Sequence, residues 1–265
     1  MRIDNDEDFK KLKILMAEDD EINQALARNL FKKNGWNCDI VENGAKAIEK
    51  MRTFNYDLIL LDVEMPQLNG YMTTMKIRNE FASPVSEVPI IAITAHVSTV
   101  ELQKCIDVGM DGYIFKPIKL AELTAKIKSV FNGDGDTAML DEKKSEPTNA
   151  DQKSLLNLSG LYASCGNNPA IVKNIINLFV TQTPENMVKL ENLLLIQDWE
   201  NLKLLCHKMK SAYSLLGNVE IKSYLQEMEE DCAKNTVNVS KFQSYIAIIK
   251  GLNLGLMREL EKESI

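Results

Sequence analysis

The chain has 265 residues, of which 45% are hydrophobic and 26% charged, and its formal net charge is −7. This composition is typical of a folded globular protein with room for two domains, and it excludes a largely disordered chain. The acidic balance argues against a general nucleic-acid-binding surface, so we expect no nucleic-acid partner.

Two further features bear on the compartment. Residues 1–8 are acidic and contain no apolar segment, unlike a secretory signal, and no apolar run approaches the roughly 20 residues that span a bilayer. The five cysteines are scattered without CxxC spacing, which favours unpaired thiols in a reducing compartment. We therefore expect a cytoplasmic protein without direct membrane insertion.

From residue 12 to residue 131, short apolar runs alternate with amphipathic stretches of helical length. Unbroken apolar runs of this length are typical of strands covered on both faces. The alternation predicts an α/β domain with a doubly wound, five-stranded parallel sheet. The predicted strands lie near residues 13–17, 37–41, 58–62, 89–94 and 113–115.

The pattern changes after residue 131. Residues 132–153 are polar and rich in Asn, Gly and charged side chains, which predicts a flexible linker. Helical periodicity dominates residues 154–263 without a convincing strand, so we expect an all-α helical bundle there. Pro169 and Pro184 are each expected to open a helix, because proline is favoured in the first helical turn.

Several predicted strands end in side chains that suit phosphoryl chemistry. Asp62 ends the third run, Glu18 and Asp19 follow the first, Thr94 closes the fourth and Lys116 follows the fifth. Because the carboxyl ends of parallel strands meet at one edge of the sheet, we expect these side chains to converge.

The convergence favours a carboxylate that accepts a phosphoryl group. Asp62 would attack phosphorus and form an acyl phosphate. Glu18 and Asp19 beside it would make the hard oxygen site that Mg²⁺ prefers. The Lys116 ammonium and the Thr94 hydroxyl would contact the phosphate. Each residue alone is more simply a cap or a loop residue, so the hypothesis depends on their joint placement.

The same segments resemble a response-regulator receiver domain, a flavodoxin-like fold, over about residues 12–131. The resemblance is carried by Ile14–Asn23, Leu60–Pro66, Thr94-Ala95 and Phe115-Lys116-Pro117.

The resemblance implies a role for each matching position. Asp62 would be the phosphoacceptor, Glu18 and Asp19 the acidic Mg²⁺ pocket, and the Glu64 backbone carbonyl a further metal ligand. Lys116 would contact the phosphate.

The resemblance also implies a switch and a backbone feature. Thr94 and Tyr113 would form the pair whose rearrangement reports phosphorylation, and a cis bond is expected before Pro117. Asp20 stands where receivers frequently have Asn, which adds a third negative charge near the pocket. Glu64 and His96 occupy positions that tune the phosphoryl lifetime in receivers. No second histidine accompanies His96, so we assign it no metal.

In the helical region the candidate is His207. On a helix it lies about 200° from Leu205 and Met209 of the apolar stripe, so we expect an exposed ring. A neutral imidazole there could accept a phosphoryl group, and Lys210 one turn later could stabilise the incoming charge.

The residues around His207 resemble the histidine phosphotransfer (HPt) domain motif. The resemblance is carried by Cys206–Ala212 and by Gly217, ten residues after His207. It implies that His207 is a second phosphoacceptor. Ser211 departs from the glycine usual four residues after the histidine, which bears on the docking of a receiver and on the rate of transfer.

The leading hypothesis is a two-module phosphorelay protein rather than an enzyme with its own kinase core, because no glycine-rich nucleotide motif is present. A histidine kinase or another phosphohistidine donor would phosphorylate Asp62, and His207 would exchange phosphoryl groups with an aspartate, including that of a downstream response-regulator receiver. Whether the chain stands alone or is the C-terminal part of a hybrid sensor histidine kinase is open.

Two alternatives belong to other classes of protein. In one, phosphorylated Asp62 is a switch for protein binding, and the helical domain only docks and does not transfer. In the other, Asp62 serves a metal-dependent phosphatase. Such enzymes commonly place a second aspartate two residues after the nucleophile, where this chain has Glu64, so we rank this hypothesis third.

Overall fold

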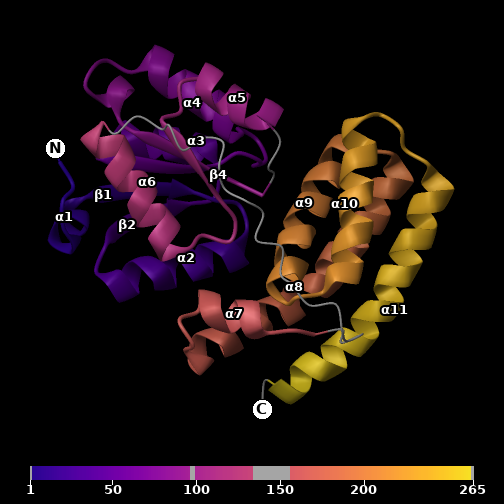
Figure 1. The fold of residues 1–265 in the computed structure, drawn as a ribbon. Coiled ribbons are helices and arrows are strands. Elements are labelled where there is room, and N and C mark those ends of the chain that lie inside the picture. The colour runs from indigo at the N-terminus through magenta and orange to yellow at the C-terminus, as the bar shows by residue number, and fades with distance from the viewer. Residues whose placement is uncertain (1, 96–98, 134–155, 264–265) are drawn as a thin grey trace. The chain divides into compact units, whose positions relative to one another are not determined.

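The computed structural model describes residues 2–95, 99–133 and 156–263, and the chain divides into two compact units, one within residues 1–152 and one within 153–265 (Figure 1). The predicted linker, residues 132–153, lies outside the described residues except for its first two. None of the described helices is both long and apolar enough to cross a membrane.

The first unit contains the predicted parallel sheet. All four strand pairings are parallel, and the strand order is β2-β1-β3-β4-β5 (Figure 1). The doubly wound α/β prediction is therefore confirmed. The strands are β1 (Lys13–Ala17), β2 (Asn37–Val41), β3 (Leu58–Asp62), β4 (Ile90–Thr94) and β5 (Gly112–Phe115).

Helices cover both faces of this sheet. Successive strand residues point to opposite faces, so Ile14 and Met16 join one core cluster whereas Leu15 and Ala17 join the other. The first cluster includes residues of α1, α2 and α6, and the second includes residues of α3, α4 and α5. These helices, with one 3₁₀ turn, are α1 (Asp6–Lys11), α2 (Glu21–Asn34), α3 (Gly44–Met51), α4 (Gly70–Glu80), η1 (Val85–Glu87), α5 (Thr99–Asp107) and α6 (Leu120–Asn132).

The short helix α1, which the sequence patterns did not reveal, is integrated into this unit. Asn5 caps it through a capping box, and Phe9 stacks on Trp36 with ring centroids 4.9 Å apart. Ile3 is buried, and its backbone N–H and C=O both bond to the Asn132 side chain at 3.0 and 3.1 Å. The N-terminal segment is thereby tied to the end of α6.

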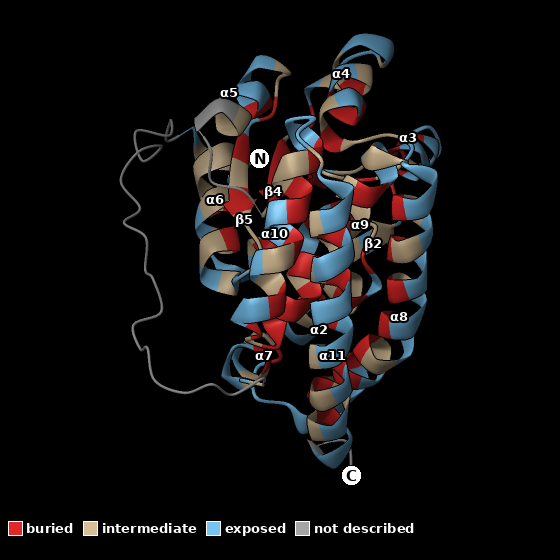
Figure 2. Cartoon of the chain, turned by 90° about the vertical axis from the view of Figure 1, so that its right-hand side faces the viewer, coloured by how far each residue is buried: buried red, intermediate tan, exposed pale blue. Residues whose placement is uncertain are grey.

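The second unit is helical over its described residues, as predicted. Buried and exposed residues alternate along its long helices, which places an apolar stripe of each in the core (Figure 2). On α9 this stripe includes Leu202, Cys206, Met209 and Tyr213. The helices are α7 (Ser159–Ser164), α8 (Pro169–Ile196), α9 (Trp199–Leu215), α10 (Val219–Ala233) and α11 (Val239–Glu263).

One predicted helix start is wrong. Pro169 does open α8, with Asn168 as its cap, but Pro184 lies inside the same helix. Thr183, directly before Pro184, and Met187, about one turn after it, are both buried in the bundle. The Thr183 hydroxyl donates to the Phe179 carbonyl at 2.7 Å. Tertiary packing therefore outweighs the loss of one backbone donor at this position.

Candidate functional site

The ends of the strands bring the predicted residues of the first unit together. Asp62 is the last residue of β3 and is only 1% exposed. Ala17 pairs with Leu61 across the β1–β3 ladder, so Glu18 and Asp19 emerge beside Asp62. These three carboxylates each have an oxygen within 4.8 Å of the others.

Lys116 lies between two of these carboxylates. Its Nζ is 2.7 Å from Asp62 Oδ2 and 2.7 Å from Glu18 Oε2. Burial would lower the pKa of Lys116, but the charges and hydrogen bonds of Asp62 and Glu18 outweigh it and hold the pKa above its ordinary value. Lys116 therefore stays protonated and partly neutralises the acidic site.

The donor set fits Mg²⁺. Three carboxylates from Glu18, Asp19 and Asp62 face a single ammonium from Lys116, so negative charge is in excess at this edge of the sheet. Hard carboxylate oxygens at a partly water-accessible edge are the ligands that Mg²⁺ takes in proteins. The geometry is thus compatible with the cation that the sequence predicts.

Neighbouring side chains hold Glu18 in place. Asn23 Nδ2 donates to Glu18 Oε1 at 3.1 Å, and Gln24 Nε2 donates to the Glu18 carbonyl at 2.7 Å. Asp20, expected to add negative charge near the pocket, has a structural role as well, because its Oδ1 caps α2 by accepting from the Asn23 backbone N–H at 2.9 Å.

A glycine allows the chain to pass close to Asp62. A Cβ on Gly70 would lie 2.5 Å from the Asp62 carbonyl oxygen, and the Gly70 N–H bonds to the Val63 carbonyl at 3.0 Å. Only glycine lets α4 begin this close to the end of β3. The Asp62 side chain also accepts a bond from the Glu64 backbone N–H at 3.2 Å.

The other two predicted residues of the site lie on the neighbouring strands. Thr94 is buried at the end of β4, and its backbone carbonyl accepts a hydrogen bond from the Lys116 backbone N–H at 2.9 Å. Tyr113 is partly exposed on β5, and the Lys126 ammonium lies 5.2 Å from its ring centroid. The peptide bond between Lys116 and Pro117 is cis, as predicted. His96 lies outside the described residues.

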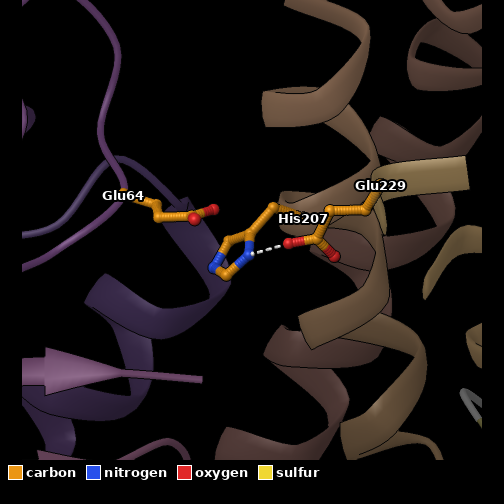
Figure 3. Close-up of side chains that lie close together, drawn as sticks. All are labelled: Glu64, His207 and Glu229. Atoms are coloured by element: carbon orange, nitrogen blue, oxygen red, sulfur yellow. Dashed lines mark hydrogen bonds and ion pairs between the residues drawn. The ribbon is translucent and has the colours of Figure 1, made fainter. Parts of the chain in front are cut away.

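In the helical unit, His207 makes a hydrogen bond that the sequence did not suggest. Its Nδ1 lies 2.8 Å from Glu229 Oε1 (Figure 3), and Lys210 Nζ lies 2.5 Å from the second oxygen, Oε2. One carboxylate from α10 therefore contacts the two candidate residues of α9.

The sequence places His207 on the exposed face of its helix, whereas in the structure its Nδ1 is engaged by Glu229 of α10. The helical-wheel argument placed the ring away from the apolar stripe but took no account of α10, which packs beside α9 and contributes Glu229. The same bond fixes the ring, because one of its two nitrogens is engaged.

The environment of Glu229 favours its ionised form. Burial opposes ionisation, but the hydrogen bond and charge of His207, together with Lys210, prevail and hold the pKa of Glu229 below its ordinary value. Sequence analysis missed Glu229 because it lies in an acidic run, Glu227–Asp231, in which nothing singles it out. Glu229 is distinguished from its acidic neighbours only by its position on α10, from which it reaches His207 and Lys210.

Comparison with known proteins identifies the domain family of each unit. Residues 14–128 match the response regulator receiver domain, and residues 174–256 match the Hpt domain. The chain joins a receiver domain to an Hpt domain. It is a part of two-component phosphorelay signalling, and its receiver has the flavodoxin-like fold that the sequence predicts.

The relatives include a sensor protein and hybrid signal transduction histidine kinases. Aerobic respiration control sensor protein ArcB of Escherichia coli is 27% identical over 231 residues, which are 85% of this chain and 28% of ArcB. Hybrid signal transduction histidine kinase B of Dictyostelium discoideum is 38% identical over 120 residues, which are 42% of this chain and 6% of the kinase. The chain thus spans less than a third of the length of these relatives.

Solved receiver structures are also similar to this chain. The receiver domain of sensor histidine kinase PA1611 from Pseudomonas aeruginosa is 34% identical to this chain, with a TM-score of 0.41. The match covers 46% of this chain and 98% of the PA1611 receiver chain.

Proposed function

We propose that Asp62 of the receiver accepts a phosphoryl group from a phosphohistidine, and that His207 of the Hpt domain carries phosphoryl groups to or from an aspartate. The observation that carries the proposal is the ion pair of Lys116 with Asp62, 2.7 Å long, at a strand end shared with Glu18 and Asp19. We also assign residues 12–131 to the receiver and residues 154–263 to the Hpt domain, with 132–153 as the linker.

Asp62 is suited to attack phosphorus. Its carboxylate is positioned by Lys116 and by the Glu64 backbone N–H, and the phosphoryl oxygens would take over the Lys116 ammonium as their counter-ion. The Thr94 hydroxyl would hydrogen-bond to the same phosphoryl group, with Tyr113 as its partner in the switch. Glu18, Asp19, Asp62 and the Glu64 carbonyl would hold Mg²⁺, which when bound supplies positive charge to the phosphoryl oxygens.

His207 is suited to attack through one nitrogen. Because Nδ1 is engaged by Glu229, the lone pair used for attack is that of Nε2. Lys210, expected from the sequence to support incoming charge, lies on the same side of α9 and is bonded to Glu229.

The partners follow from this chemistry. Receiver and Hpt domains transfer phosphoryl groups, so we expect the donor to be a histidine kinase or another phosphohistidine and the acceptor beyond His207 to be a downstream response-regulator receiver. We expect no ATP-dependent kinase activity from these two domains. A cytoplasmic location and a lack of nucleic-acid partners stay predictions.

A labelling experiment tests the proposal. The full chain is incubated with Mg²⁺ and radiolabelled acetyl phosphate, and the wild type is compared with Asp62→Ala and His207→Gln. Acyl phosphate is lost in alkali and phosphohistidine in acid, so lability assigns the label. We expect both kinds of label on the wild type, only alkali-labile label on His207→Gln, and none on Asp62→Ala.

Two further conditions sharpen the result. Chelation of Mg²⁺ or the substitution Asp19→Asn should strongly reduce labelling of Asp62, whereas Asp57→Asn, at the opposite end of β3, should not. Alkali-labile label alone on the wild type would contradict transfer to His207 and favour the binding switch. Continuous release of phosphate from a small phosphate ester would favour the phosphatase.

A further inference from the structure

The loop after β3, which carries the Glu64 carbonyl, contains a strained turn. The Leu68 N–H bonds to the Pro66 carbonyl at 2.8 Å, which closes a three-residue turn centred on Gln67. The φ of Gln67 is 66°, a left-handed value that residues other than glycine seldom adopt. Turns of this kind are rare and strained, so the surrounding structure must hold this one in place.

Asn43, at the start of α3, contacts this turn from outside the loop. The residue is only 4% exposed, and its side chain has two partners. Its Oδ1 accepts the Lys46 backbone N–H at 2.9 Å and so caps α3, whereas its Nδ2 donates to Gln67 Oε1 at 3.1 Å. The adjacent Gly44 N–H also donates to the Leu68 carbonyl at 3.2 Å. Two successive residues of the chain at the start of α3 therefore hold the strained turn.

The contact is close, and it holds the part of the loop that β3 does not. A Cβ on Gly44 would lie 2.6 Å from the Leu68 carbonyl oxygen, so only glycine lets α3 begin this near the loop. The two ends of the loop are bonded to β3 and the residue after it, through the Glu64 and Gly70 backbone N–H groups. The middle of the loop, at Gln67, depends on α3.

We propose that Asn43 is a positioning residue for Mg²⁺, because its side-chain amide holds the loop that carries the Glu64 carbonyl in the conformation that binds the cation. The inference rests on the proposed metal site at Asp62. It adds a residue of another element, which touches neither the cation nor the phosphoryl group. Without this hydrogen bond, Gln67 can relax to an ordinary backbone conformation, and the fraction of molecules competent to bind Mg²⁺ falls.

Substitutions separate the bond to Gln67 from the capping of α3. Serine also caps helices, but its side chain is too short to reach Gln67, so Asn43→Ser keeps the cap and removes the bond. Asn43→Asp keeps both, since the Gln67 amide can turn over and donate from Nε2 to the new carboxylate. Asn43→Asp combined with Gln67→Glu places two acceptors against each other and removes the bond again.

The test is a titration of the full chain with Mg²⁺ alone, without a phosphodonor, followed by amide chemical shifts. We expect Asn43→Ser to weaken Mg²⁺ binding about two- to fivefold, the range for losing one hydrogen bond that holds the loop. Asn43→Asp should bind at least as tightly as the wild type. The double variant should bind more weakly than Asn43→Asp, although it carries one more negative charge. Asn168→Ser, at the cap of α8 in the helical unit, is the matched control and should leave the affinity unchanged.

Hydrogen exchange in the absence of Mg²⁺ separates positioning from general stability. In Asn43→Ser we expect the Leu68 amide to lose protection about five- to tenfold. The Lys46 amide at the cap and the Gly70 amide at the end of the loop should keep their protection, which also shows that the variant is folded. An equal loss at all three amides, or Mg²⁺ affinity equal to that of the wild type, would overturn the inference and leave the metal site intact. A wild type that binds no Mg²⁺ would instead overturn the proposed metal site, and this inference with it.

Discussion

Single charged residues determine both candidate sites. In the receiver, one ammonium, that of Lys116, is in contact with the carboxylates of Glu18 and Asp62. In the Hpt domain the arrangement is reversed, since one carboxylate, that of Glu229, contacts His207 and Lys210. The side chains of Lys116 and Glu229 are only 8% and 3% exposed. Removing either one leaves the opposite charges or polar groups without compensation, which is costly where little water can reach them.

The pKa of Glu229 predicts how stability depends on pH. Because its folded-state pKa lies below the ordinary glutamate value of about 4.3, Glu229 stabilises the Hpt domain above that value, and this contribution is lost as the pH falls through the folded-state pKa. We expect Glu229→Gln to be less stable than the wild type by about 2 kcal/mol at pH 7, and this difference to shrink by pH 3. Urea unfolding followed by Trp199 fluorescence in a Trp36→Phe background measures it. A difference that stays constant from pH 7 to pH 3 would contradict the assignment.

At the scale of elements, the folded receiver includes helix α1, which lies before the residues that match the receiver family. The match begins at residue 14, but Ile3, Phe9 and Leu12 are buried in the same core cluster as β1, α2 and α6. Helix α1 is too short to be stable alone and depends on this burial. The segment is therefore part of the folded receiver.

Truncation of Phe9 tests this role of α1. Phe9→Ala removes a ring that is 1% exposed and stacked on Trp36, so we expect a loss of about 3 kcal/mol in the free energy of unfolding of the receiver. Trp36 emission, read in a Trp199→Phe background, should shift to longer wavelength as water reaches the indole. Phe54→Ala is the matched control, since Phe54 is 54% exposed and should cost little. Equal stability of the two variants would mean that α1 does not contribute to the core.

At the scale of the whole molecule, two different architectures follow each other in one chain. The sheet unit depends on pairings between distant strands, whereas the helical unit packs neighbouring helices such as α9 and α10. Each unit has its own buried residues and its own candidate phosphoacceptor. The relay hypothesis needs both phosphoacceptors, but the folding of each unit depends on its own core.

Separate expression of the units tests this independence. We expect residues 1–133 and residues 156–263 each to fold, with circular dichroism spectra that sum to the spectrum of the full chain. The first piece should take alkali-labile label from acetyl phosphate and Mg²⁺, because all the residues assigned to the Asp62 site lie within it. A first piece that is unfolded, or folded but unlabelled, would show that the receiver requires the helical unit.

The sequence by itself determined the architecture and most of the receiver site. Short apolar runs of strand length and their order along the chain are local properties, and the rule that parallel strands align their carboxyl ends then brings Glu18, Asp62 and Lys116 together. The motif around His207 indicated the Hpt domain in the same way. These inferences succeeded because they depend on periodicity and on positions close in the sequence.

Only the tertiary structure decided which side chains contact across elements. Glu229 is 22 residues from His207, and its role depends on the rotation of α10 against α9, which periodicity does not specify. Packing likewise allows helix α8 to continue past Pro184, and it places Phe9 of α1 against Trp36. In each case the free energy comes from contacts between distant residues, and local sequence patterns do not encode which distant residues will meet.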